Sequence, residues 1–397
     1  MPYGPNAWLI KNSSKYLASL RINLLAYMAV IKLTIEDFLQ KAAYSPVLDV
    51  RSPGEFAHAH IPGAHSFPLF TDEERKVVGT AYKQQSREKA IKIGLVYFGV
   101  KMEPMVTAAE SIIAEAHKNN PQNAKTVLVH CWRGGMRSAA IAWLLDLYGF
   151  KVYTLAGGYK AFRNWVLQQF QLNYPFKVLG GFTGSGKTEV LQQMAQHKAI
   201  VIDLEALAHH KGSAFGSLGQ LVQPSQEMFE NKLALQLYSA MQQITENQME
   251  SADRFIWLED ESQRIGTVNL TAHIFQQKQA APVFFIDIPF NERLDYILSG
   301  YGKFDKEQLV NAIIRIKKRL GGLETKNAIN FILEDDIKSA FAILLTYYDK
   351  LYTKGLHQRN NLNELLHKIN CPMVNAAINS NAVLHHNASM GQAATQP

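Results

Sequence analysis

Short apolar segments alternate with longer amphipathic segments along the first half of the chain. The apolar segments have the length of strands and cover residues 29–33, 46–51, 66–69, 127–130 and 152–155. The segments between them begin on helix-start signals, such as Thr34 ahead of Glu36 and Pro53 after Ser52. This alternation predicts a parallel sheet with helices on both faces. In such a sheet, ligands bind beyond the carboxyl ends of the strands.

The same alternation returns in the second half of the chain. Apolar runs occupy residues 176–180, 199–205, 255–261 and 283–289. Residues 341–352 are aromatic and apolar at helical spacing, which predicts a helix packed in a core. We therefore expect an α/β fold with two parallel-sheet domains, over residues 29–170 and 175–370, and a helical part toward the end of the second domain.

Both ends of the chain depart from this pattern. Residues 1–28 carry basic residues, the first acidic residue is Glu36, and Met28 comes just before the first predicted strand. We expect residues 1–28 to be an extension upstream of the native start or a disordered segment, with a targeting peptide as the alternative. Residues 375–397 are rich in Asn, Ala, Ser and Gln, and this composition predicts a disordered tail.

Composition narrows the classes of protein to consider. The chain has 397 residues, which is enough for two or three domains. No uninterrupted apolar run approaches the roughly 18 residues of a membrane span, so we expect none. The two cysteines, Cys131 and Cys371, argue against a disulfide framework and indicate a reducing compartment, the cytoplasm. The net charge of +7 favours a polyanionic partner such as nucleic acid.

The residues after the apolar segment 127–130 form the first candidate site. They are Cys131, Trp132, Arg133, Gly134, Gly135, Met136, Arg137 and Ser138, and a predicted helix follows. A strand–loop–helix turn points backbone N–H groups and the positive end of the helix into the loop. This environment lowers the pKa of Cys131 and makes it a nucleophilic thiolate. The glycines and the two arginines suit an anion cradle, whereas a merely buried cysteine needs neither.

The second candidate site follows the apolar segment 176–180. Residues 181–188 read Gly-Phe-Thr-Gly-Ser-Gly-Lys-Thr, a complete Walker A sequence between a strand and a helix. Lys187 would contact the outer phosphate oxygens, and the Thr188 hydroxyl could hold Mg²⁺. The predicted diphosphate-binding residues are Gly181, Gly184, Ser185, Gly186, Lys187 and Thr188. Because such a loop recognises phosphates and no base, the identity of the diphosphate stays open.

Charged residues at other strand and helix ends supply further candidates. The candidate Walker B or substrate-positioning residues are Asp203, Glu259, Asp260, Glu261 and Arg264. The candidate contacts to a nucleic-acid backbone are Lys83, Lys211, Arg315, Lys318 and Arg319. Cations at a helix C-terminus are favourable in any case, so the last three also fit a purely structural role. The adjacent His209 and His210 are joined by no cysteine, and we predict no metal site there.

The first half of the chain resembles a rhodanese domain, which transfers sulfur or selenium through a cysteine thiolate. The resemblance rests on the Cys131 loop together with Leu48–Arg51, Glu55–Phe56, His60–Ala64 and Gly157–Tyr159. The spacing from Cys131 to Arg137 also fits cysteine-dependent phosphatases, some of which share the rhodanese fold. The loop alone therefore leaves two chemistries open, which are chalcogen transfer and hydrolysis of a phosphate ester.

A rhodanese domain followed by a P-loop domain resembles the tRNA 2-selenouridine synthase family, over about residues 31–352. Further segments that carry the resemblance are Val78–Gly79, Tyr82–Gln84, Asp203–Glu205, Lys211–Gly216, Leu258–Ser262 and Lys318–Gly321. The resemblance implies an RNA-binding transferase that acts on tRNA with 2-thiouridine at the wobble position. It implies that geranyl diphosphate first alkylates the sulfur, and that selenophosphate then delivers selenium.

Two anionic substrates need two anion-binding loops, and the chain has two, so we assign one substrate to each loop. Selenophosphate is assigned to the Cys131 loop, with Cys131, Arg133 and Arg137 as the catalytic residues. Geranyl diphosphate is assigned to the Walker A loop, whose usual ligand, ATP, is the competing occupant. We expect no tightly bound cofactor, Mg²⁺ at most through Thr188, and a selenophosphate-supplying enzyme as a partner. The alternative is a rhodanese-fold cysteine phosphatase or sulfurtransferase fused to an ATP-using, kinase-like domain.

Overall fold

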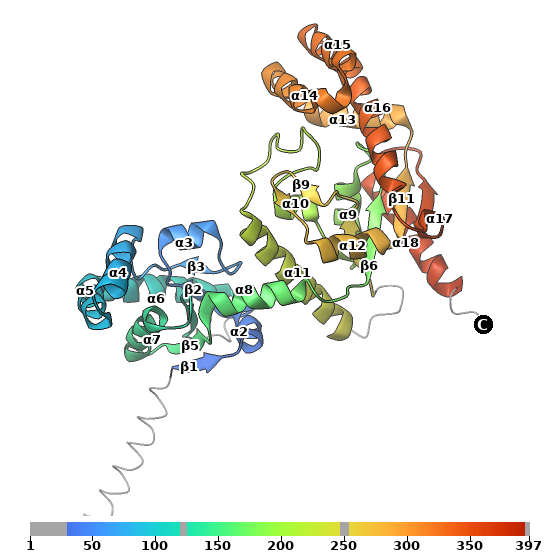
Figure 1. The fold of residues 1–397 in the computed structure, drawn as a ribbon. Helices are drawn as coiled ribbons and strands as arrows, with labels where there is room; N and C mark the ends of the chain where they lie inside the picture. The colour runs from blue at the N-terminus through green and yellow to red at the C-terminus, as the bar shows by residue number, and fades with distance from the viewer. Residues whose placement is uncertain (1–29, 120–124, 247–253, 394–397) are drawn as a thin grey trace, which may run out of the picture. The chain divides into compact units, whose positions relative to one another are not determined.

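A computed structural model describes residues 30–119, 125–246 and 254–393 (Figure 1). The chain divides into two compact units between Trp165 and Val166. Each unit contains its own five-stranded sheet. The predicted extension at residues 1–28 lies outside the described residues.

All strands of the first sheet are parallel, and their order is β1-β5-β4-β2-β3. The strands are β1 (Ile31–Leu33), β2 (Val47–Asp49), β3 (His65–Ser66), β4 (Thr126–His130) and β5 (Lys151–Leu155). The helices are α2 (Ile35–Ala42), α3 (Pro53–His58), α4 (Asp72–Gln84), α5 (Arg87–Gly99), α6 (Met102–Asn119), α7 (Met136–Tyr148) and α8 (Gly158–Gln169). The predicted parallel α/β architecture of the first half is confirmed.

The central strand of this first sheet leads directly to the cysteine loop. Val127, Leu128 and Val129 in β4 are fully buried. Because β4 lies between β2 and β5, the loop after β4 is flanked by the loops that follow those two strands. Side chains and turns from residues far away in the sequence therefore converge on Cys131.

The second sheet is also parallel, with the order β12-β11-β6-β8-β7. Its strands are β6 (Phe176–Gly180), β7 (Ile200–Ile202), β8 (Ile256–Glu259), β11 (Val283–Asp287) and β12 (Leu366–Asn370). A separate two-stranded antiparallel ribbon consists of β9 (Arg264–Ile265) and β10 (Val268–Asn269). The P-loop follows the central strand β6, so the carboxyl ends of β8 and β11 border it.

Helices surround the second sheet and extend beyond it as a helical region (Figure 1). They are α9 (Lys187–Gln196), α10 (Leu204–Ala208), α11 (Gln226–Glu246), α12 (Ala272–Ala280), α13 (Phe290–Tyr301), α14 (Lys306–Leu320), α15 (Gly322–Leu333), α16 (Ile337–Leu356), α17 (Leu362–Leu365) and α18 (Ala376–Ala393). As predicted, α16 packs into a core, with Phe341, Leu344 and Leu345 buried. No helix of the described segments has both the length and the apolarity that a bilayer span requires.

The prediction of a disordered tail is wrong for most of residues 375–397. Residues 376–393 form α18, which packs against α9 and the sheet. Val383 is fully buried in a cluster with Leu191 and Met194 of α9, and Asn387 accepts a hydrogen bond from Lys177. This segment contains few apolar residues, and its polar composition therefore led to the prediction of disorder. The helix nevertheless forms, because a narrow apolar contact is enough to hold it. The second α/β unit therefore continues past its predicted end at residue 370.

Candidate functional site

Cys131 follows β4 at the carboxyl edge of the first sheet. The residue is only 3% exposed, because the loop returns over it before α7 begins at Met136. The backbone N–H of Gly135 donates a hydrogen bond to the Sγ atom at 3.3 Å, and the Oγ atom of Ser138 lies 3.2 Å from Sγ. The sulfur atom thus faces hydrogen-bond donors from the loop and from the first turn of the helix.

These contacts decide the protonation of the thiol. Burial raises the pKa of Cys131, but the Ser138 hydroxyl and the backbone N–H groups of Ser138, Arg133 and Gly135 lower it, and the net shift is downward. Hydrogen bonds stabilise the thiolate more than desolvation disfavours it. The predicted low-pKa nucleophile therefore has a geometric basis.

Replacing Ser138 by alanine is expected to raise the pKa of Cys131, because the hydrogen bond that lowers this pKa most is lost. The measurement is the rate of iodoacetamide alkylation against pH, whose midpoint reports the thiol pKa. Ser111→Ala is the control, since the exposed Ser111 hydroxyl donates to the Thr107 carbonyl of its own helix. An unchanged midpoint in Ser138→Ala would show that this hydroxyl does not stabilise the thiolate.

Two glycines bring the turn after β5 against the cysteine loop. Gly158 has φ +61°, and a Cβ atom there would lie 2.3 Å from the carbonyl oxygen of Cys131. Gly134 has φ +63°, and its Cβ would lie 2.6 Å from the carbonyl oxygen of Leu155. The backbone N–H of Tyr159 closes this contact with a hydrogen bond to the Cys131 carbonyl at 2.8 Å. Only glycine fits either position, which explains the glycines of the sequence motif.

Arg137 is held at the edge of the loop by Glu55, a residue of α3. Its Nη1 atom donates to Glu55 Oε2 at 2.8 Å. Burial by itself raises the pKa of Glu55. The hydrogen bond and the charge of Arg137 lower this pKa by a larger amount, so that it falls to about 2. Beneath this pair, Arg51 forms a buried ion pair with Asp49 and stacks over the Tyr159 ring at 3.7 Å. The remaining loop side chains of Trp132, Arg133 and Met136 are exposed.

The Walker A loop connects β6 to α9 in the second unit. Lys187 Nζ donates to the Gly181 carbonyl across the loop at 3.0 Å. Gly184 and Gly186 have φ values of +82° and +71°, which allow the tight turn. The Ser185 hydroxyl is buried and has no hydrogen-bond partner in the described segments. Since a buried polar group without a partner is costly, a ligand that supplied an acceptor for this hydroxyl would be favoured here.

Four carboxyl groups gather beside Thr188. The Thr188 hydroxyl donates to Glu205 Oε2 at 3.0 Å. Burial and then the charge of Glu261 raise the pKa of Glu205 to about 8, while Lys187 lowers it. Burial and the neighbouring Asp203 raise the pKa of Glu259 well above its usual value. The structure thus brings together three of the candidate acids and adds Glu205, although no group of His, Cys, Asp and Glu in the described residues has a metal-binding arrangement.

The raised pKa of Glu205 predicts a specific dependence of stability on pH. A carboxyl group with a folded-state pKa of about 8 and an ordinary pKa of 4.5 stabilises the fold fully below pH 4.5. This contribution is lost progressively as the pH rises from 4.5 to about 8, because over that range the unfolded chain releases the proton that the folded state still holds. Glu205→Gln is therefore expected to gain stability relative to the wild type as the pH rises from 5 to 8.5.

Urea denaturation between pH 5 and 8.5 measures this difference in the free energy of unfolding. The exposed Glu334 gives the matched control variant Glu334→Gln, whose stability should track the wild type at every pH. A constant difference between Glu205→Gln and the wild type would contradict the prediction.

Asp260 has different partners from these carboxyl groups and belongs to a separate hydrogen-bond network. Its carboxylate accepts hydrogen bonds from Lys278 at 3.2 Å, Arg359 at 2.5 Å and Tyr352 at 2.7 Å. Burial raises the pKa of Asp260, but the charges of Lys278 and Arg359 outweigh it and the net shift is downward. Tyr352 also accepts a hydrogen bond from the Gly181 N–H, so this buried network supports the floor of the P-loop.

The P-loop has a second anchor that the sequence did not indicate. Arg293 in α13 donates to the Thr183 carbonyl at 3.0 Å and forms a two-bond ion pair with Asp349 of α16. Arg264, a candidate for substrate positioning, donates a hydrogen bond to the Gly266 carbonyl at 2.9 Å. The sequence offered no signal for Arg293, because its partners are far away along the chain.

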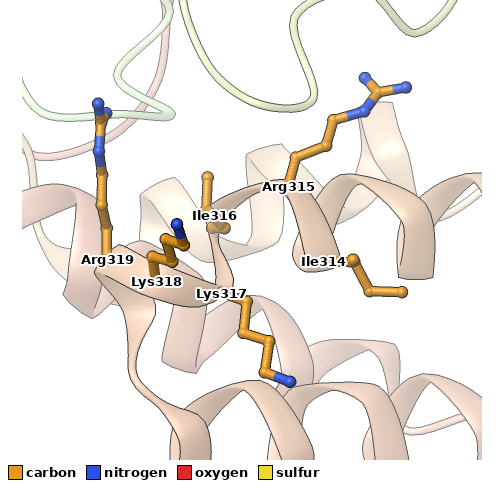
Figure 2. A pocket seen from close by; sticks show the side chains of 6 residues that line it. All are labelled: Ile314, Arg315, Ile316, Lys317, Lys318 and Arg319. Atoms are coloured by element: carbon orange, nitrogen blue, oxygen red, sulfur yellow. The ribbon is translucent and has the colours of Figure 1, made fainter.

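The basic candidates lie on exposed surface. Arg315, Lys318 and Arg319 occur in α14 and, with three neighbouring residues, line a surface hollow, in which Arg315 and Arg319 extend to one side and Lys317 to the other (Figure 2). Burial and then the charge of Arg315 lower the pKa of His210, so Arg315 lies beside the loop that contains Lys211. Lys83 is exposed near the end of α4 in the first unit.

Comparisons with known proteins cover both units. Residues 34–164 match the model of the rhodanese-like domain, and residues 174–381 match the model of the tRNA 2-selenouridine synthase AAA domain. Three similar relatives are each named tRNA 2-selenouridine synthase. The protein of Pseudomonas putida strain W619 is 33% identical over 77% of this chain and 88% of its own length. The protein of Sulfurovum sp. strain NBC37-1 is 35% identical over 78% of this chain and 88% of its own length. The protein of Bordetella bronchiseptica strain RB50 is 38% identical over 65% of this chain and 66% of its own length.

The two domain matches, in this order, agree with the geometry of the two loops. A cysteine loop on a rhodanese-like sheet precedes a Walker A loop on a second parallel sheet. The second model alone covers more than half of the chain, and the relatives align across both units. This chain therefore belongs to the tRNA 2-selenouridine synthase family.

Proposed function

We propose that this enzyme converts 2-thiouridine at the wobble position of tRNA into 2-selenouridine, in two steps that use its two anion-binding loops. Family membership supports the overall conversion, since the relatives carry that activity in their names. The net charge of +7 suits a tRNA substrate. The single observation that carries the two-step scheme is the presence of two separate cradles, a thiolate loop at Cys131 and a P-loop at Lys187.

The first step is alkylation of the thiocarbonyl sulfur by geranyl diphosphate at the P-loop. The sulfur forms a bond to the geranyl carbon, the carbon–oxygen bond breaks, diphosphate leaves, and the N3 proton of the base is released. Lys187 and the loop N–H groups stabilise the charge that develops on the departing diphosphate. The buried Ser185 hydroxyl fits this assignment, because a phosphate oxygen would supply its missing partner. The alkylated sulfur is then a competent leaving group, which a thiocarbonyl sulfur is not.

A Mg²⁺ ion fits the chemistry of the residues beside Thr188. The Thr188 hydroxyl and the Glu205 carboxyl group would hold it together with the diphosphate oxygens. When bound, such an ion neutralises charge on the leaving diphosphate. Burial and the charge of Glu261 raise the pKa of Glu205 in the free protein, and a bound cation would lower it again.

The second step takes place at the Cys131 loop, where selenophosphate binds. Arg133 and the loop N–H groups neutralise its charge, and Arg137 closes the edge of the cradle through Glu55. We assign the tRNA backbone to the basic residues Lys83, Lys211, Arg315, Lys318 and Arg319. An enzyme that makes selenophosphate is the expected partner, and the cytoplasm, where tRNA is modified, is the expected location.

Mass spectrometry of tRNA nucleosides tests this scheme. The purified enzyme with 2-thiouridine tRNA and geranyl diphosphate should yield S-geranyl-2-thiouridine, and added selenophosphate should convert it to 2-selenouridine. ATP in place of geranyl diphosphate should give no product. Selenouridine formation that needs ATP and proceeds without geranyl diphosphate would overturn the assignment of the P-loop.

A further inference from the structure

The Cys131 loop has the dimensions of a phosphoryl cradle. Five residues separate Cys131 from Arg137, and Ser138 follows directly. The Gly135 N–H lies 3.3 Å from Sγ, and the Ser138 hydroxyl lies 3.2 Å from Sγ and 3.1 Å from the Gly135 carbonyl. Backbone N–H groups and a hydroxyl therefore surround the sulfur on the side where the helix begins. Donors in this arrangement suit a tetrahedral oxyanion attached to the sulfur as well as they suit the thiolate itself.

The oxidation state of selenium limits what the thiolate can do. Selenium bound to phosphorus in selenophosphate is at the level of selenide, and selenium bound to carbon in 2-selenouridine is at the same level. A selenium–sulfur bond on Cys131 would require a two-electron oxidation and a later reduction. The proposed reaction supplies neither an oxidant nor a reductant. The route that conserves electrons breaks the phosphorus–selenium bond by transfer of the phosphoryl group.

We infer that Cys131 attacks the phosphorus atom of selenophosphate and becomes transiently phosphorylated, which sets hydroselenide free beside the substrate base. The sulfur–phosphorus bond forms, the phosphorus–selenium bond breaks, and the proton of monoprotonated selenophosphate leaves with selenium. Hydroselenide then attacks C2 of the S-geranylated base, geranylthiolate departs, and the proton moves from selenium to N3. Water finally hydrolyses phosphocysteine to phosphate and regenerates the thiolate. The inference rests on the proposed binding of selenophosphate at this loop.

Ser138 has a definite part in this sequence. When water attacks the phosphocysteine, the Cys131 thiolate is the leaving group, and the hydroxyl at 3.2 Å stabilises it. A serine hydroxyl that bonds to a charged atom contributes enough that its loss should slow hydrolysis roughly 10-fold. Ser138→Ala should therefore accumulate phosphorylated enzyme, whereas Ser138→Thr, which keeps the hydroxyl, should not.

The test uses the full-length enzyme with pre-geranylated tRNA and selenophosphate that carries a radiolabel on either phosphorus or selenium. Samples are quenched in alkaline denaturant, in which thiophosphate esters persist, and label bound to protein is counted. We expect phosphorus label on the wild type and roughly 10-fold more on Ser138→Ala, with none on Cys131→Ser. Peptide mapping should place the label at Cys131, and phosphate release should match 2-selenouridine formation one for one.

The possible results separate the inference from the proposed function. Selenium label on Cys131 overturns the inference and shows chalcogen transfer through the sulfur. No phosphorus label on either the wild type or Ser138→Ala, with selenation that still depends on Cys131, also overturns it but leaves selenophosphate at this loop. Selenation that persists in Cys131→Ser overturns the proposed function of the loop as well.

Discussion

Replacing Cys131 by serine is expected to lower the rate of 2-selenouridine formation by at least about 10³-fold while tRNA geranylation continues at the wild-type rate. The hydroxyl of serine stays protonated at neutral pH, whereas hydrogen bonds from the loop lower the pKa of the Cys131 thiol. The measurement is the single-turnover conversion of S-geranylated tRNA by selenophosphate, followed by nucleoside mass spectrometry. Geranylation is measured separately with 2-thiouridine tRNA.

The second cysteine of the chain gives a matched control for this substitution. Cys371 is also 3% exposed, but burial and then the charge of Asp287 raise its pKa, so it remains a thiol. It packs in an apolar cluster after β12. Cys371→Ser should therefore keep both activities. Selenation that survives in Cys131→Ser, or that is lost in Cys371→Ser, would contradict the assignment.

Replacing Lys187 by alanine should have the opposite pattern. We expect geranylation to fall by about 10²–10³-fold, because the charge that stabilises the departing diphosphate is removed. Selenation of tRNA that already carries the S-geranyl group should remain at the wild-type rate, since that step takes place at the Cys131 loop. The two half-reactions are assayed separately with their own tRNA substrates, again by nucleoside mass spectrometry.

Lys198 supplies the control for Lys187. It is an exposed lysine just beyond the C-terminal end of α9, the helix that Lys187 begins. Lys198→Ala removes the same charge from the same unit without changing the P-loop, and should leave both half-reactions intact. If Lys187→Ala and Cys131→Ser impaired the same half-reaction, the assignment of one substrate to each loop would be wrong.

The sequence alone predicted the two α/β units and both loops, because each loop is a local structure. The Cys131 loop and the Walker A loop each consist of consecutive residues between a strand and a helix, with glycines where the backbone must turn. The spacing of residues within each loop determines which backbone N–H groups point into the loop, independently of the rest of the chain. The candidate nucleophile and the candidate phosphate-binding loop can therefore be predicted from short stretches of sequence.

The tertiary structure decided which distant residues complete each loop. Arg137 lies against Glu55, which is far away in the sequence, and Thr183 in the P-loop is held by Arg293. Such pairs depend on the order of strands in a sheet, and that order cannot be deduced from apolar spacing. The helix α18 is a further case, because its few buried residues are covered by α9 and by the sheet, which are distant in the sequence.

The acidic residues at the end of β8 show most clearly why the sequence alone could not assign the charges around each loop. Glu259 and Asp260 are adjacent in sequence and chemically alike, so the sequence placed both in one candidate group. Successive side chains of an extended segment point to opposite sides. Glu259 consequently joins Asp203 beside the P-loop, whereas Asp260 pairs with Lys278 and Arg359 in a buried network beneath it. The sequence by itself determined that two glycine-containing loops follow the central strands of two sheets, and only the tertiary structure decided which charges face them.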